Sequence, residues 1–330
     1  MSVKFETLRQ LVGNTPLIMI DYKYKGEKRT LYAKAEYYNF SGSVKDRIAL
    51  NILEKAFQTQ AIKPGDIICE TTSGNTGISF CAIGAYLGHK VVIYMPNWLS
   101  EERKSIMTIY GAELRLVSKE EGGFLRCLEL AKKYAEHDHV FCPLQFDNPE
   151  NVEAHFLTTA KEIETQMNSF GAGIDAIAAG IGTGGTIMGL NKYFKPKGVK
   201  VYPIEPSNSP TLSTGYKVGS HRIQGISDDF IPSILQLNEL EKVLGVDDGD
   251  SIIMSQKLNR ELGLGVGISS GANFLGAVLA QNETKGNVVT IFADDNKKYL
   301  STDLAKVEPV KAGFLTPDIE LSGIRAIRGN

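Results

Sequence analysis

Residues 174–190 read IDAIAAGIGTGGTIMGL. The apolar run 174–179 predicts a buried strand, the glycine-rich segment 180–186 predicts a turn, and the residues after it predict a helix. Amides at the start of a helix are unpaired and carry partial positive charge, so a turn of small residues with two threonine hydroxyls suits a phosphate group. The stretch therefore predicts a βα unit with an anion site at the end of its strand.

The same alternation of short apolar runs and longer amphipathic segments continues on both sides of this unit. Further strands are predicted at 31–35, 67–70, 90–95, 113–117, 201–204 and 288–292, and helices at 44–57, 78–87 and 100–111. This pattern is typical of an α/β fold with mostly parallel sheets. Turn residues at 143–149 predict a boundary, which gives an N-terminal domain at 1–145 and a C-terminal domain at 146–330.

Composition excludes several classes of protein. The 36 Lys and Arg residues balance 38 Asp and Glu residues, which gives a net charge of -2, so no excess positive charge exists to bind nucleic acid or an anionic membrane. With 42% hydrophobic and 22% charged residues the chain is expected to be globular. Four dispersed cysteines and the absence of a long apolar segment indicate reduced thiols and a cytoplasmic protein. The five histidines lack ligand spacing, so no metal site is expected.

Two other strings stand where a strand passes into a helix. TSGNTG at 72–77 could bind a carboxylate at a helix start, or it could be an ordinary capped turn. GISSGA at 267–272 places two hydroxyls before a helix expected to start near Asn273, as an N-cap would. Lys45 lies at another predicted helix start, where the helix dipole disfavours a second cation and would make the amine nucleophilic; a solvated surface lysine is the alternative.

The first stretch also supports a competing hypothesis. Gly180, Gly182 and Gly185 satisfy the GxGxxG pattern of dinucleotide-binding proteins, and Glu205 follows 20 residues after Gly185, where a ribose-binding carboxylate would stand. An NAD-dependent oxidoreductase is therefore a second hypothesis for this chain.

Taken in order, the motifs resemble the cysteine synthase and cystathionine β-synthase family of pyridoxal phosphate (PLP) enzymes, which catalyse β-replacement. The resemblance covers nearly the whole chain and is specific because the motifs are collinear. It rests on GNTPL at 13–17, SGSVKDR at 41–47, TSGNTG at 72–77, MPNWLSEER at 95–103, QFDNP at 145–149, GTGGT at 182–186, QGI at 224–226 and GISSGA at 267–272. It implies the two-domain tryptophan synthase β-like fold (PLP fold type II), with a mobile subdomain near 88–135.

The resemblance also implies roles for individual residues. Lys45 would form the internal aldimine with the cofactor, Asn75 would hydrogen-bond the ring hydroxyl oxygen, and Ser269 would face the pyridine nitrogen. The cofactor phosphate would be held by Gly182, Thr183, Gly184, Gly185 and Thr186. The substrate α-carboxylate would be bound by Thr72, Ser73, Gly74, Thr76 and Gln145. These tasks use strings that an NAD enzyme would leave without a role.

A serine at the ring nitrogen leaves the pyridine largely neutral, which favours β-elimination through an α-aminoacrylate over transamination. The commonest reaction of the family makes cysteine and acetate from O-acetylserine and sulfide, and the resemblance implies this cysteine synthase reaction for the chain. Asp228 and Asp229 stand where many cysteine synthases have small residues, so either could activate water and convert cysteine to serine and hydrogen sulfide. The alternative is a pair of acids in a solvated loop.

The family resemblance further suggests a homodimer and, as in some relatives, another enzyme's C-terminal tail binding in the cleft. Residues 306–330 match the family poorly, and the sequence indicates no role for them.

Overall fold

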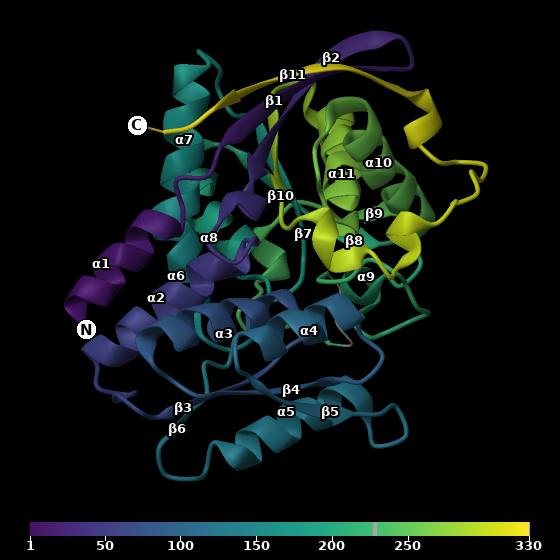
Figure 1. Ribbon diagram of the computed structural model, residues 1–330. Helices are drawn as coiled ribbons and strands as arrows, with labels where there is room; N and C mark the ends of the chain where they lie inside the picture. Colours follow the sequence, from purple (N-terminus) through teal and green to yellow (C-terminus); the bar gives the residue numbers. More distant parts are fainter. Residues whose placement is uncertain (227–229, 330) are drawn as a thin grey trace.

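The computed structural model describes residues 1–226 and 230–329, which form two sheets covered by helices (Figure 1). The smaller sheet has four parallel strands in the order β5-β4-β3-β6. Their bounds are β3 (Ile67–Thr71), β4 (Val91–Pro96), β5 (Glu113–Val117) and β6 (Val140–Phe141).

The larger sheet has seven strands in the order β11-β1-β2-β10-β7-β8-β9. Strands β2, β10, β7, β8 and β9 run parallel, whereas β1 pairs antiparallel with both β2 and β11. Their bounds are β1 (Leu17–Tyr24), β2 (Glu27–Ala35), β7 (Ala176–Gly180), β8 (Lys200–Pro206), β9 (Leu244–Val246), β10 (Val288–Phe292) and β11 (Ile319–Ile327).

Helices cover both faces of each sheet. The α-helices are α1 (Ser2–Leu11), α2 (Lys45–Gln58), α3 (Asn75–Leu87), α4 (Glu101–Ile109), α5 (Gly123–Tyr134), α6 (Pro149–Ala154), α7 (Ala160–Ser169), α8 (Gly185–Phe194), α9 (Thr211–Thr214), α10 (Asp248–Leu262) and α11 (Ile268–Thr284). A π-helical turn, η2 (His155–Thr159), joins α6 to α7, and the 3-10 turns are η1 (Glu36–Tyr38), η3 (Lys195–Lys197), η4 (Leu237–Glu239), η5 (Asn296–Tyr299), η6 (Asp303–Ala305) and η7 (Thr316–Asp318). Within the described ranges, none of the helices has the length and apolar character needed to span a bilayer.

The cores follow from the alternation of side chains along the buried strands. On β10, Val288 and Phe292 pack in the core that contains α10 and α11, while Val289 and Ile291 face the core that contains α7 and α8. Strands buried on both faces read as continuous apolar runs, which is why the central strands were predictable from sequence.

Two elements differ from the predictions. Helix α11 begins at Ile268 and not near Asn273, so Ser269 lies in its first turn and is not an N-cap. The helix can start earlier because Gly267, which has no side chain, packs against Asp294 and Tyr299 at its N-cap. The tail, for which the sequence indicated no structure, forms β11 at the edge of the large sheet.

The predicted division at residue 145 crosses the large sheet. Strands β1 and β2, at 17–35, pair with β10 and β11 and so lie in the same sheet as the strands after residue 146. In Figure 1 the purple β1 and β2 lie at the top with the yellow β11, away from β3, β4 and β5. The boundary at 145 stays a prediction, as does the mobile subdomain at 88–135.

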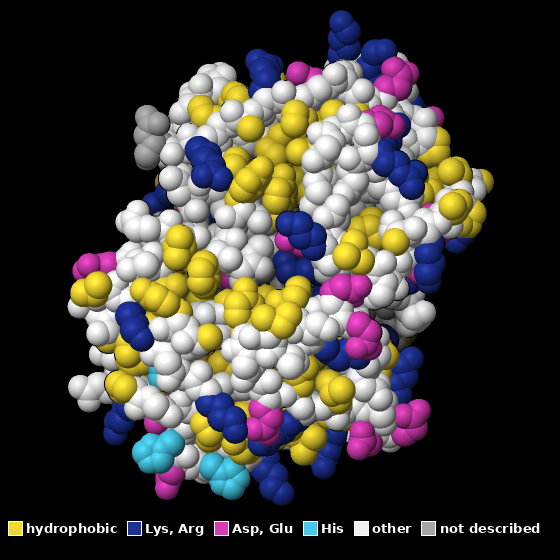
Figure 2. Space-filling model, viewed as in Figure 1, with side chains coloured by type: hydrophobic (Ala, Val, Ile, Leu, Met, Phe, Trp, Pro, Cys, Tyr) yellow, Lys and Arg dark blue, Asp and Glu magenta, His cyan; other side chains and the backbone are white. Residues whose placement is uncertain are grey.

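Charged side chains of both signs are interspersed over the face shown in Figure 2, with no single basic patch. This distribution agrees with the near-zero net charge and offers nothing that would bind a phosphate backbone on this face.

Candidate functional site

Four helices start around one cavity that opens to solvent. They are α2 at Lys45, α3 at Asn75, α8 at Gly185 and α11 at Ile268. Because each helix start carries unpaired amides and partial positive charge, this convergence favours anionic ligands. Within the described residues, the charged side chains that line the cavity are Lys45 and Arg103, and no carboxylate lines it.

The structure brings the predicted site residues together here, although they are distant in sequence. Those that line the cavity are Lys45, Thr72, Ser73, Asn75, Thr76, Gln145, Gly182, Thr183, Gly184, Thr186 and Ser269. Gly74 and Gly185 lie behind the lining, against other side chains. Asp228 and Asp229 fall outside the described residues, although Gly225 and Ile226 just before them line the cavity.

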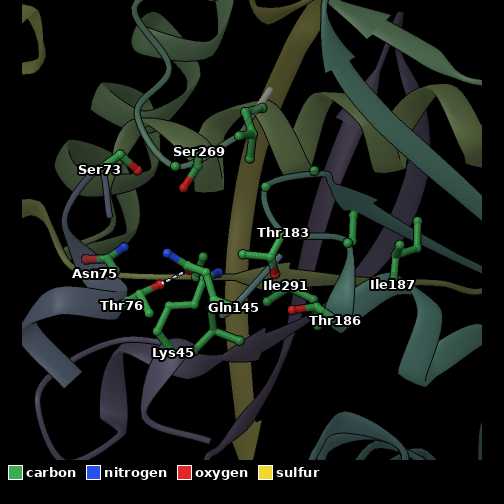
Figure 3. A pocket seen from close by; sticks show the side chains of 18 of the residues that line it. Lys45, Ser73, Asn75, Thr76, Gln145, Thr183, Thr186, Ile187, Ser269 and Ile291 are labelled. Carbon is green, nitrogen blue, oxygen red and sulfur yellow. Dashed lines mark hydrogen bonds between the residues drawn. The ribbon is translucent and has the colours of Figure 1, made fainter. Parts of the chain in front are cut away.

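Lys45 is the first residue of α2, and its half-buried side chain points into the cavity (Figure 3). The segment before it is tied to the end of β10, because the Val44 amide donates to the Ala293 carbonyl at 2.8 Å. The Lys45 amide donates to Oγ of Ser43 at 3.3 Å. These backbone contacts set the direction in which the lysine leaves the helix.

The start of α2 is anchored a second time by a buried ion network. Arg47 donates from Nε to Glu36 at 2.6 Å and from Nη1 to Glu162 at 2.7 Å. Burial opposes ionisation of Glu162, but the neighbouring Arg47 and Lys34 outweigh it and lower the pKa of Glu162 to about 2. The network joins α2 to α7 and to η1, and so holds Lys45 relative to both.

The turn at 72–77 leaves several hydrogen-bond donors without a protein partner among the described residues. Oγ1 of Thr72 accepts from the amides of Gly74 and Gly77, at 2.9 and 3.3 Å, which leaves its hydroxyl hydrogen for a ligand. The N-cap residue of α3, Gly74, has no side chain to cap the helix, so the amides of Asn75 and Thr76 remain available. Gly74 has φ +151, and a Cβ on it would lie 2.2 Å from Cδ of Arg103.

Gln145, in the segment between β6 and α6, contacts this turn. Its Nε2 donates to the Thr71 carbonyl at 2.6 Å, and its Oε1 accepts from Thr76 at 2.5 Å, the dashed contact in Figure 3. One amide hydrogen of Gln145 is left for a ligand. Gln145 therefore holds the turn in place through Thr71 and Thr76 and leaves one hydrogen-bond donor for a ligand.

Glu70 lies buried behind the same turn. It accepts from the Thr71 amide at 2.8 Å and from the Gln145 amide at 3.2 Å. Loss of water around the carboxylate raises the pKa of Glu70 to about 8, although the backbone amides favour the ionised form. Glu70 connects the strand end before the turn at 72–77 to Gln145, and the sequence did not predict this role.

The turn at 182–186 packs closely against other parts of the chain. A Cβ on Gly182 would lie 2.5 Å from the Gly225 carbonyl, and one on Gly185 would lie 1.8 Å from Oδ1 of Asn151. Gly184 has φ +87 and caps α8 without a side-chain hydrogen bond. Open amides together with Thr183 and Thr186, which line the cavity, fit a dianion.

Two neutral side chains support this turn from behind. Asn151 donates to the Gln145 carbonyl at 2.8 Å and to Oγ1 of Thr183 at 2.9 Å. His155, on the π-helical turn, places Nε2 3.1 Å from Oγ1 of Thr186 and Nδ1 2.9 Å from Oγ1 of Thr159. Burial, with smaller effects of Arg47 and Lys45, holds the pKa of His155 well below its usual value, so the ring is neutral.

Glu205, the carboxylate that the dinucleotide hypothesis requires, is used elsewhere in this structure. Glu205 is buried and accepts hydrogen bonds from the amides of Leu212 and Ser213, at 2.7 and 3.4 Å, at the start of α9. It does not line the cavity. Across residues 1–226 and 230–329, no three His, Cys, Asp or Glu side chains are grouped to hold a metal ion.

The residues that the sequence did not reveal are the ones that support the predicted turns. They are Glu70, Arg103, Asn151, His155 and Asp294. Glu70 stands next to the substrate string, which is a weak local signal. Arg103 is the last residue of the string at 95–103, whereas Asn151, His155 and Asp294 lie outside the quoted strings.

Comparison with known proteins agrees with this geometry. The family model for pyridoxal-phosphate-dependent enzymes matches residues 8–294. A cysteine synthase of Staphylococcus aureus (strain N315) is 40% identical over 303 residues, 91% of this chain and 96% of that protein.

Solved structures add two further relatives. A hydrogen sulfide-producing enzyme from Fusobacterium nucleatum superimposes with a TM-score of 0.97 and 51% identity, covering 100% of both chains. A variant of that enzyme was solved in complex with an α-aminoacrylate intermediate. The cysteine synthase of Entamoeba histolytica gives a TM-score of 0.82 and 33% identity, covering 92% of each chain.

Proposed function

The chain belongs to the family of pyridoxal-phosphate-dependent enzymes, and we propose that it releases hydrogen sulfide from L-cysteine, with water adding to give L-serine. The observation that carries this choice is the likeness to the hydrogen sulfide-producing enzyme, at 51% identity over the whole length of both chains. Cysteine synthesis from O-acetylserine and sulfide is the second candidate, supported by the 40% identical cysteine synthase.

The residues around the cavity fit the cofactor. The turn from Gly182 to Thr186 would hold its phosphate, because Thr183 and Thr186 line the cavity beside the open amides at the start of α8. Asn75 would bind the ring hydroxyl oxygen, and Ser269 would offer the ring nitrogen an uncharged hydroxyl. When bound, pyridoxal phosphate supplies an electron sink for charge left at Cα when a bond there breaks.

Different side chains would bind the substrate amino acid and move its proton. Thr72, Ser73 and the first amides of α3 would bind the α-carboxylate, and Gln145 would add a donor. Lys45 would hold the cofactor and, once the substrate amine has freed it, move the proton at Cα. Asp228 and Asp229 remain candidates for orienting the incoming water.

The spectrum of the purified protein tests the proposal. We expect a visible absorption band in wild type incubated with pyridoxal phosphate, and its loss in Lys45→Ala. Lys55→Ala is the matched control, because Lys55 is an exposed lysine on the same helix. A wild-type protein that takes up no cofactor would exclude the assignment.

Steady-state assays separate the two reactions. Hydrogen sulfide release from L-cysteine alone is expected to exceed cysteine formation from O-acetylserine and sulfide when compared as kcat/KM. The opposite order would make the chain a cysteine synthase. If Asp228→Asn and Asp229→Asn both leave sulfide release unchanged, neither acid activates water.

The assembly state and partners expected from the family are also proposals. A homodimer predicts a mass in solution of twice the 36.1 kDa of the chain, which light scattering measures. An enzyme tail that binds in the cleft would compete with L-cysteine.

A further inference from the structure

Asp294 lies where three of the motif strings meet, just after the end of β10. Its backbone forms an antiparallel bridge with Ser43, in the string that carries Lys45. Its carbonyl accepts from the amide of Gly267, at the start of the string that carries Ser269, at 3.1 Å. Its side chain accepts from Nδ2 of Asn75, in the substrate string, at 2.8 Å.

The packing around Asp294 leaves its carboxylate little freedom. The residue is fully buried, and a Cβ on Gly267 would lie 2.3 Å from its Oδ1 and 2.4 Å from Cε2 of Tyr299. The absence of a side chain at Gly267 therefore lets the carboxylate reach Asn75. Tyr299 holds the same oxygen that Asn75 contacts, because its hydroxyl donates to Oδ2 at 2.7 Å.

A carboxylate only accepts hydrogen bonds, so it fixes which end of the Asn75 amide faces it. The nitrogen donates one hydrogen to Asp294, and the oxygen of Asn75 has no hydrogen-bond partner among the described residues. The nitrogen keeps a second hydrogen, and Asn75 lines the cavity. With the amide reversed, its oxygen would face the carboxylate, and two acceptors would repel each other.

We propose that Asp294 is a positioning residue that holds the Asn75 amide with its nitrogen available to the ring hydroxyl oxygen of the cofactor. The inference rests on the proposed function, since it takes Asn75 as the residue that binds this oxygen. It assigns to the segment after β10 a task in the reaction that no motif in the sequence indicates.

The side chain of Asp294 also connects the site to α4, through Arg103. Nη2 of Arg103 lies 3.7 Å from Oδ2 of Asp294, and its guanidinium stacks over the Tyr299 ring at 4.5 Å. The neighbouring residue Glu102 accepts from the amide and the hydroxyl of Ser301, both at 2.7 Å. Asp294 thus receives charge compensation from a helix of the predicted mobile subdomain.

The test replaces Asp294 by its closest isostere in the holoenzyme. Asp294→Asn keeps the shape but lets its own amide present either end to Asn75, so the orientation is no longer determined. We expect the absorption maximum of the bound cofactor to shift and kcat to fall about 10-fold, the equivalent of one hydrogen bond to a charged group, while KM changes less than about 2-fold. Asp295→Asn is the control, because Asp295 contacts Lys297 and Lys298 and not Asn75.

A second variant keeps the test decisive if Asp294→Asn does not fold. Tyr299→Phe removes the donor to Oδ2 but keeps the ring beneath Arg103, and we expect a smaller spectral shift in the same direction. An absorption maximum and kcat equal to those of Asp295→Asn would overturn the inference. A wild-type protein without a cofactor band would instead refute the proposed function.

Discussion

The two glycine-rich turns that open α3 and α8 look alike in the sequence, but the side chains behind them differ. Behind the turn at 72–77 lie the buried charged residues Arg103 and Asp294 and the buried carboxyl of Glu70, whose pKa is raised to about 8. Behind the turn at 182–186 lie two buried neutral ones, Asn151 and His155. Both turns present open amides to the same cavity, so the difference lies in what supports them.

The difference matches two kinds of ligand. Neutral support leaves the positive end of the α8 dipole unopposed, which suits a phosphate that stays bound through the reaction cycle. Charged support makes the other turn sensitive to protonation and to the position of α4, which suits a carboxylate that binds and leaves. The comparison teaches that the same local motif acquires its role from residues outside it.

The largest expected effect comes from adding a side chain at Gly185, in the turn at 182–186 that is proposed to hold the phosphate. In Gly185→Ala the new Cβ would lie 1.8 Å from Oδ1 of Asn151, so the turn must widen or Asn151 must lose its contacts. Overpacking of about 1–3 kcal/mol corresponds to roughly 5- to 150-fold weaker cofactor binding. Titration of the apoprotein with pyridoxal phosphate measures it, with Gly173→Ala as control because its Cβ meets nothing within 4 Å. Unchanged affinity in Gly185→Ala would contradict the phosphate assignment.

The matching change in the other turn should affect the amino acid and leave the cofactor bound. Gly74→Ala places a Cβ 2.2 Å from Cδ of Arg103, at φ +151. We expect KM for L-cysteine to rise about 10-fold while the cofactor band is retained. Gly65→Ala shares the positive φ, at +90, but meets nothing within 4 Å, and so controls for backbone strain. If Gly74→Ala loses the cofactor instead, the two turns do not divide the ligands as proposed.

Glu70→Gln tests, through pH, the carboxyl that supports the turn at 72–77. Because the pKa of Glu70 is raised to about 8, the native state holds a proton that the unfolded state releases near its ordinary value of 4.5. Its contribution to the free energy of unfolding is therefore complete below about pH 4.5 and is lost as pH rises through 8. We expect the free energy of unfolding of Glu70→Gln, measured by urea denaturation, to be about 1 kcal/mol below that of wild type at pH 5 and above that of wild type at pH 9, where the buried wild-type carboxylate is ionised.

Glu101→Gln, at an exposed carboxylate on α4, serves as the control for the pH series. A difference between Glu70→Gln and wild type that is equal at pH 5 and pH 9 would mean that the carboxyl is not protonated in the native state.

The smallest effect is expected behind the phosphate turn, at His155. The neutral ring donates one hydrogen bond and accepts one, and His155→Asn can replace the contact to Thr186 only in part. Cofactor affinity should fall about 3- to 10-fold, in line with about one hydrogen bond. Between pH 6 and 8 the affinity of wild type should show no step from this residue, because burial holds the pKa of His155 well below its usual value. If wild-type cofactor affinity does show a step between pH 6 and 8, and His155→Asn removes it, the His155 ring becomes charged in this range. The support behind the turn at 182–186 would then not be neutral.

The sequence predicted the central strands and the two turns because each is a local pattern. An apolar run buried on both faces and a glycine string before a helix can be read without knowing the rest of the fold. Strands β1 and β11 escaped prediction, since β11 lies at the sheet edge with mostly exposed side chains and its strand state depends on pairing with β1. The start of α11 was misplaced by five residues, as it depends on the close packing of Gly267 against Asp294.

By itself, the sequence determined an α/β fold, the family, the cofactor and the identity of Lys45 and the two anion-binding turns as candidates. These are properties of short strings whose chemistry is carried by neighbours along the chain. Only the tertiary structure decided that four helix starts share one cavity, that Glu205 is used at α9, and that Asp294 joins three of the strings. The reason is physical, because burial and hydrogen-bond partners depend on residues that the fold brings together from far along the chain.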